Sequence, residues 1–340
     1  MLDFLRGANP VLTLSRSVRV ARYVRPYLRD LYERRLVQGP EPYRPRSVWK
    51  PWNYDSEILA FKNRIGENID TNVLYLCFID KSFASYTNSK DMSDQLRDNT
   101  TLAEKGRAVS DRYIRGFLRK FYPRIPEEWI SCIRDRLLSD EELSHVGSHL
   151  GITDVLQYSL EEKRFDDSPL LPVINQPPPN STIATSFLAV IGAIAHNQKA
   201  ADLFVRDFIL TRLLTLEFCS DFPFPLQDEP FRLLSGVLRF YKQGPPEPRL
   251  QRQSSMNTLL ACYQVGIYSD RQLIGEAPGE TIDVAEKEAA LQALRNLFGI
   301  QDNRPCLPLS GPYISVDDIL PNPTLEDYLR TEEKVEKCTS

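Results

Sequence analysis

The chain has 340 residues, of which 42% are hydrophobic and 26% are charged, and its formal net charge is −4. This composition is typical of a globular chain of one or two domains, and no apolar run is long enough to predict a membrane-spanning helix. The six cysteines are widely spaced and include no Cys-x-x-Cys pair. They therefore favour a reducing compartment and argue against a disulfide framework or a thiolate zinc site.

Positive charge is concentrated at the beginning of the chain. Residues 1–46 contain ten arginines, no lysine and four acids, a local charge of +6 against −10 for the remainder. Between Arg6 and Arg29 the arginines recur among leucine, valine and tyrosine at spacings that suit an amphipathic helix. We interpret residues 1–51 as an import presequence and linker that direct the chain to the mitochondrial matrix. The alternative is an ordered basic arm that binds a polyanion.

Residues 52–222 are predicted to form a mostly helical domain. Apolar residues recur there at intervals of three and four, as in the series Ile58, Phe61, Ile65 and Ile69. The segment from Leu170 to Ser181 interrupts the pattern with four prolines and is expected to be an exposed loop.

Residues 228–299 have the pattern of a smaller α-β-β-β-α domain. A helix is expected to about Lys242, followed by strands around Leu250, over residues 260–268 and over residues 272–275. A helix over residues 282–298 would place alanines 285, 289 and 293 on one face, where small side chains allow close packing on a sheet, and Gly299 would end it. The tail, residues 300–340, is rich in proline and charge and is expected to be loosely held.

The two domains resemble a ribonuclease III domain followed by a double-stranded-RNA-binding domain. Asn99, Leu102, Gly106, Ala108 and Val109 agree with the family signature Asn-Glu-Arg-Leu-Glu-Phe-Leu-Gly-Asp-Ala-Val. Residues 78–86, 143–152 and 187–193 are similar to three further family segments in the same order. The expected fold is thus an all-α ribonuclease III-like domain followed by a small α+β RNA-binding-like domain.

The whole chain more closely resembles a family of mitochondrial large-subunit ribosomal proteins built on this fold. The similarity is carried by residues 52–61, 187–193 and 275–281. It implies a structural role, with ribosomal RNA and neighbouring large-subunit proteins as partners. A ribonuclease III-like dimer partner is also implied, as a homodimer or a pseudo-dimer. No cofactor, small-molecule substrate or membrane is expected.

The nuclease chemistry of the resembled family requires carboxylates that hold divalent metal ions. Position by position, the resemblance places these four carboxylates at Ala103, Arg107, Thr185 and Leu188, and none of these residues is an acid. A guanidinium at position 107 would also repel a metal ion. We therefore expect no catalytic residue, no metal and no nuclease activity. The alternative is an active double-stranded-RNA endonuclease, or a partner subunit of one, in mitochondrial RNA processing; a cytosolic regulatory binding module is a third hypothesis.

The helix that contains this signature is unusually basic. From Lys105 to Arg124 there are seven basic residues and one acid, Asp111. At about 100° per residue, one face would carry basic side chains opposite Val109, Tyr113, Phe117 and Phe121. In an RNA-binding fold, such a face favours contact with phosphates. The candidate contacts are Lys105, Arg112, Arg115, Arg119 and Lys120.

The smaller domain lacks the features by which the resembled RNA-binding family holds duplexes. Residues 253–257 contain no histidine, and the start of the last predicted helix has Asp283 and Glu286 where the family has lysines. Arg249 and Arg252 remain as candidate contacts. Indiscriminate duplex binding is therefore not expected. His145 and His149, four residues apart, are interpreted as surface or core histidines rather than metal ligands.

Overall fold

The computed structural model describes residues 24–37, 39, 46, 50–90, 97–159, 177–216, 224, 229–255, 258–301, 307–316 and 319–330. Its contacts separate one unit, residues 1–50 with 166–177, from a second that contains the rest. In the first unit, residues 24–37 form an exposed helix in which Arg29 pairs with Glu33 and Arg34 with Asp30. Most of the expected presequence lies outside the described residues. Among the described helices, none combines the length and apolarity needed to cross a bilayer.

The first part of the second unit is helical. Its elements are α2 (Tyr54–Ile65), α3 (Thr71–Cys77), α4 (Lys81–Lys90), α5 (Thr100–Phe121), α6 (Glu127–Leu137), α7 (Asp140–Leu150), α8 (Ile152–Val155), α9 (Asn180–Ile194), α10 (Gln198–Phe208) and the short 3-10 helix η3 (Leu210–Leu214).

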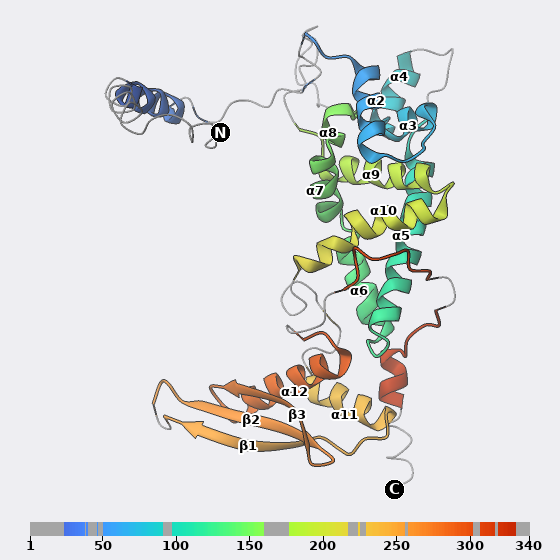
Figure 1. Ribbon diagram of the computed structural model, residues 1–340. Helices are drawn as coiled ribbons and strands as arrows, with labels where there is room; N and C mark the ends of the chain where they lie inside the picture. Colours follow the sequence, from blue (N-terminus) through green and yellow to red (C-terminus); the bar gives the residue numbers. More distant parts are fainter. Residues whose placement is uncertain are drawn as a thin grey trace, which may run out of the picture. The chain divides into compact units, whose positions relative to one another are not determined.

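The apolar helix α9 lies in the middle of this helical part and packs against α3, α5, α7 and α10 (Figure 1). From Ile183 to Ile194 it is buried on almost every side, with only Thr185 partly exposed. A helix that is apolar all round is expected at such a central position. The surrounding helices have recognisable ends: Asn53 and Ser139 cap α2 and α7, which terminate at the left-handed glycines Gly66 and Gly151.

The second part has the predicted α-β-β-β-α order. Helix α11 (Pro230–Phe240) precedes strands β1 (Glu247–Ser254), β2 (Cys262–Ser269) and β3 (Gln272–Gly279), which form an antiparallel sheet in the order β1-β2-β3, and α12 (Ile282–Phe298) follows. Figure 1 shows α12 lying along the sheet, where it packs on β2 and β3, with α11 beside it.

Three alanines allow α12 to approach the sheet closely, as the sequence predicted. Ala285, Ala289 and Ala293 are fully buried. A Cβ atom on Gly275 of β3 would lie 2.6 Å from the backbone nitrogen of Ala293, so this glycine is required by the same close approach. Gly299 ends α12 with φ of 75°, also as predicted.

Several predicted boundaries were wrong, among them the end of the third strand, which continues to Gly279 rather than to residue 275. The basic helix was expected to continue to Arg124, but α5 ends at Phe121 because Pro123 lacks the backbone N–H needed to extend it. The proline-rich loop was expected to continue to Ser181, but α9 begins at Asn180 with Pro179 at its N-cap. The preceding residues 160–176 lie outside the described part.

The tail was expected to be loosely held, and this was wrong for its described residues. Val316, Leu325 and Tyr328 are buried. The Asn322 side chain donates hydrogen bonds to the backbone oxygens of Tyr122 (2.8 Å) and Ile125 (2.9 Å). The prediction from composition was wrong because a segment rich in proline and charge can still contain apolar side chains that are buried. Residues 331–340 lie outside the described part.

Candidate functional site

The positions that correspond to the nuclease signature lie where α5 and α9 cross. The two helices touch through glycines: a Cβ atom on Gly106 would lie 2.9 Å from the backbone nitrogen of Gly192 and would also overlap Leu188. A Cβ atom on Gly192 would in turn overlap the backbone of Leu102. The fold therefore brings the two signature segments together, through an approach that only glycine permits.

The four side chains at this crossing do not form a metal site. Ala103 and Leu188 are buried and apolar, and Arg107 is exposed and cationic. The Thr185 hydroxyl donates a hydrogen bond to the Ser181 backbone oxygen at 2.8 Å. Divalent magnesium prefers carboxylate oxygens and water, so these residues do not fit the metal that the nuclease chemistry would require.

The other described residues also lack a group of side chains that could bind a metal ion. Within the described ranges, no three His, Cys, Asp or Glu side chains lie close enough together to hold a metal ion. His145 and His149 stack edge to face, with ring centroids 4.5 Å apart, and both are exposed on α7. Exposed histidines without a third ligand are consistent with the surface role given to them above.

Asn99, the first residue of the signature, has a structural position at the start of α5. Its side chain is fully buried and donates hydrogen bonds to the Cys77 backbone oxygen and the Ser186 hydroxyl, both at 3.2 Å. These contacts join α5 to α3 and α9. The signature thus retains a residue that assembles the fold, at the same site where the carboxylates are absent.

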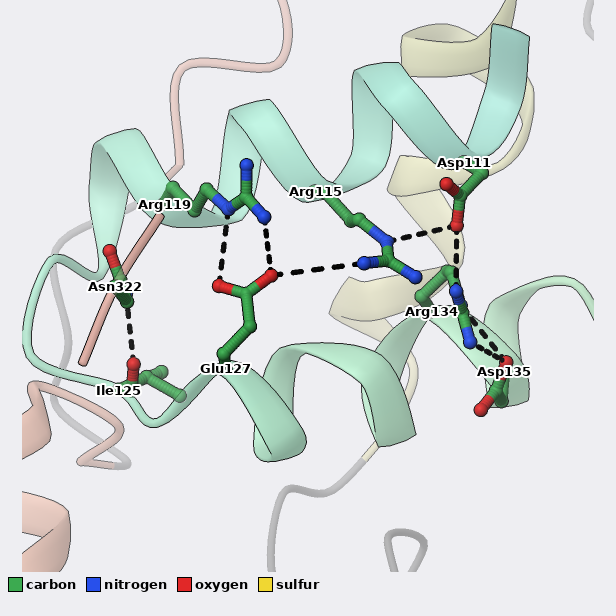
Figure 2. A network of polar contacts seen from close by, with 8 residues as sticks. All are labelled: Asp111, Arg115, Arg119, Ile125, Glu127, Arg134, Asp135 and Asn322. Carbon is green, nitrogen blue, oxygen red and sulfur yellow. Dashed lines mark hydrogen bonds and ion pairs between the residues drawn. The ribbon is translucent and has the colours of Figure 1, made fainter. Parts of the chain in front are cut away.

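Three arginines of the basic face of α5, Arg112, Arg115 and Arg119, are paired with acids, and two of these acids lie on other helices. Figure 2 shows Arg119 donating two hydrogen bonds to Glu127 of α6, one of them 3.2 Å from Nε to Oε2. Arg115 lies 3.0 Å from Asp111 and 3.9 Å from Glu127. Arg134 of α6 completes the network with a 2.8 Å contact to Asp111. These arginines hold α6 against α5.

Arg112, on the same face of α5 as Arg119, pairs with an acid of a different helix. It donates a 2.7 Å hydrogen bond to Asp202 of α10, whose side chain is fully buried. The Tyr313 hydroxyl donates to the second oxygen of Asp202 at 2.9 Å. A buried carboxylate requires such partners, and this one joins α5, α10 and the tail.

The other basic residues differ in whether their side chains are free to contact RNA. Lys105 and Lys120 are exposed on α5 and make no ion pair with any described residue. Arg252 on β1 is likewise exposed. Arg249 pairs with Glu247 at 2.7 Å and lies over the Tyr268 ring at 5.1 Å. Arg124, beyond the end of α5, lies over the Tyr241 ring at 5.2 Å.

Comparison with known proteins identifies the two parts of the chain. A family model described as the endonuclease domain of large ribosomal subunit protein mL44 matches residues 53–194. A second model, described as the MRPL44 dsRNA-binding domain, matches residues 224–329. The chain belongs to the mL44 family. The ribonuclease III-like and RNA-binding-like fold class expected from the sequence is therefore confirmed.

Two relatives named large ribosomal subunit protein mL44 are similar to the chain, one of them over most of its length. The mL44 protein of Caenorhabditis elegans is 29% identical over 293 residues, which cover 83% of this chain and 69% of that protein. The mL44 protein of Neurospora crassa is 31% identical over 109 residues, which cover 32% of this chain and 24% of that protein.

Solved structures similar to this mL44 family member include ribonuclease III and Dicer. The nuclease domain of ribonuclease III from Campylobacter jejuni is 21% identical, with a TM-score of 0.35, and the match covers 49% of this chain and 99% of that one. The Dicer of Pichia stipitis is 15% identical, with a TM-score of 0.30, covering 66% and 94% of the two chains.

Proposed function

We propose that this chain is a structural constituent of the large subunit of the mitochondrial ribosome, located in the matrix, where it binds ribosomal RNA and neighbouring subunit proteins without cleaving RNA. The name of the relatives, large ribosomal subunit protein, supports assembly into that subunit. The arginine-rich composition of residues 1–46 supports mitochondrial import. The endonuclease-type domain serves as a scaffold in this proposal.

The observation that carries the non-cleaving role is the composition of the α5–α9 crossing. Ribonuclease III chemistry needs negative oxygens that hold metal ions beside the scissile phosphate. Here the corresponding side chains are Ala103, Arg107, Thr185 and Leu188, which supply two apolar groups, one cation and one neutral hydroxyl. The fold of a nuclease domain is maintained while the groups that would make it a nuclease are replaced.

RNA contact is assigned in this proposal to the basic residues that remain free of acids. Lys105 and Lys120 are separated by fifteen positions on α5, or about 22 Å along the axis, and could contact phosphates on successive parts of one RNA surface. Arg252 offers a further contact from β1. Arg112, Arg115 and Arg119 stabilise the helical domain through their ion pairs instead.

A ribonuclease III-like dimer partner is not included in the proposal. Large and stable dimer interfaces expose apolar side chains when the subunits are separated. In the described part of the helical domain, the exposed large hydrophobic residues are Leu59 on α2 and Leu214 on η3. Two isolated leucines on different elements give little support to such an interface.

Gradient sedimentation of mitochondrial lysate, with immunodetection of the chain, tests the proposed assembly. The chain is expected to co-migrate with large subunits and to remain with them when low magnesium separates whole ribosomes into subunits. Recovery only in the light fractions, under conditions that keep large subunits intact, would refute the proposal. Co-migration with a ribonuclease activity on precursor RNA, away from ribosomal subunits, would instead favour a role in RNA processing.

A further inference from the structure

One end of the β1-β2-β3 sheet carries apolar side chains that the described chain leaves uncovered. Leu259 and Leu260 lie in the connection between β1 and β2, with exposures of 105% and 81%. Ile282 and Val284, in the first turn of α12, are 43% and 46% exposed. We refer to these four residues as the apolar end. Apolar side chains of this size gain free energy when a partner removes them from water.

The strand register brings both segments to the same end of the sheet. Ser254, the last residue of β1, pairs with Cys262, and the next residue of β2, Tyr263, pairs with Gly279 at the end of β3. Neighbouring strands are about 4.8 Å apart, so the paired ends of β1 and β3, from which these two segments continue, lie within about 10 Å of each other across the sheet. Both pairs of apolar side chains are therefore at the same end of the sheet.

Acidic side chains border this surface. Glu280 precedes α12, and Asp283 and Glu286 lie in its first turns. None of the three forms an ion pair with any residue in the described ranges. Asp283 can be explained by the positive end of the helix dipole. That explanation does not extend to Glu280 outside the helix, or to four uncovered apolar side chains.

This combination favours a protein over RNA as the partner of these four side chains, while Arg252 on β1 stays a separate candidate for RNA contact. RNA presents phosphates, which the carboxylates would repel and the leucine side chains could not bind. A second copy in a symmetric arrangement would place like acids opposite each other, which is also unfavourable. A protein surface with an apolar centre and a basic border matches both the exposed side chains and the charges.

We propose that the apolar end is a docking surface for a different protein, whose contacting face has an apolar centre bordered by lysine or arginine side chains. The proposal does not depend on assembly into ribosomes, because any protein of this chemistry that meets the chain in the cell could occupy the surface.

Site-specific photocrosslinking of the full chain in intact cells tests the proposal. A p-benzoylphenylalanine replaces Leu260, and a matched variant has it at Leu273, which is 47% exposed near the opposite end of β3. We expect the first variant to give a nuclease-resistant adduct with one protein whose crosslinked peptide combines apolar residues with lysine or arginine. The Leu273 variant should not give that adduct.

Charge reversal in the same assay tests the acidic border. Combining Glu280→Lys, Asp283→Lys and Glu286→Lys with the photoreactive residue at position 260 should reduce adduct yield by about tenfold, because like charges would then face each other. The neutral set Glu280→Gln, Asp283→Asn and Glu286→Gln should cause a smaller loss and provides a variant with less effect on folding. A nuclease-sensitive adduct, an undiminished yield after charge reversal, or no adduct at position 260 would overturn the proposal.

Discussion

Gly106 of α5 and Gly192 of α9 lie backbone against backbone. A Cβ atom on Gly106 would be 2.9 Å from the Gly192 nitrogen, inside the distance that real Cβ atoms keep. We therefore expect Gly106→Ala to force the two helices apart and to lower the free energy of unfolding by about 2 to 3 kcal/mol. Urea unfolding followed by circular dichroism measures the change.

The control for this substitution is on the same helix. Glu104 is exposed, so Glu104→Ala should change the free energy of unfolding by less than about 0.5 kcal/mol. Equal stability of the Gly106→Ala and Glu104→Ala variants would show that the helix crossing is not closely packed.

The Arg112–Asp202–Tyr313 cluster should stabilise the helical domain and its contact with the tail. Asp202→Ala leaves an arginine and a tyrosine hydroxyl without their buried acceptor. Arg112 is partly exposed, so water can solvate it, and we expect a loss of about 2 to 3 kcal/mol rather than the full cost of a buried unpaired charge. Thermal unfolding of the full chain is the measurement.

Asp135 provides the comparison for the buried carboxylate. It contacts Arg134 at 2.6 Å, but its side chain is 67% exposed. Asp135→Ala should therefore cost less than about 1 kcal/mol. If the two alanine variants lost equal stability, burial of Asp202 would not account for its contribution.

The described cysteines should differ sharply in reactivity. Burial raises the pKa of Cys77 to about 12, so the thiolate that reacts with iodoacetamide is scarce until the pH approaches that value. Cys262 is exposed. At about pH 8, peptide mass spectrometry should find Cys262 alkylated in the native chain and Cys77 alkylated only after unfolding in urea. Rapid native labelling of Cys77 would contradict its burial.

Lys105 and Lys120 should contribute to RNA affinity. Each single substitution, Lys105→Glu or Lys120→Glu, should weaken binding to a large-subunit ribosomal RNA transcript and reduce the salt dependence of log K by about one unit. Filter binding over a range of salt concentrations measures both quantities. Lys287→Glu on α12 is the matched control, because Lys287 is exposed beside the acidic border. A loss of the same size in the control would remove the assignment to α5.

Local patterns in the sequence predicted the small domain well. The alanine stripe and Gly299 predicted α12, and the strand predicted over residues 260–268 corresponds to β2. These features depend on contacts between an element and one neighbouring layer. The limits of the first and third strands were harder to predict. β1, for example, is exposed along its whole length and has no apolar alternation.

Contacts between residues far apart in the sequence could not be predicted in the same way. Helical periodicity placed Arg112 and Arg119 on one face of α5, but it could not show that Asp202 and Glu127 lie opposite them. The packing of the tail could have been inferred from one feature of the two helices that it contacts, α5 and α11. Gly116 and Gly236 are glycines in helices, and the tail residues Val316 and Tyr328 occupy the space where their side chains would lie.

The central claim is that the α5–α9 crossing belongs to an RNA-binding fold but has no residues that could support cleavage of RNA. Incubation of the purified full chain with labelled duplex RNA in Mg²⁺, beside a ribonuclease III as positive control, tests it most directly. The account predicts intact RNA at every concentration of the purified chain. The reason is that the residues at the four positions, Ala103, Arg107, Thr185 and Leu188, offer no carboxylate to a metal ion. Multiple-turnover cleavage that requires Mg²⁺ and is abolished by a chelator would contradict it.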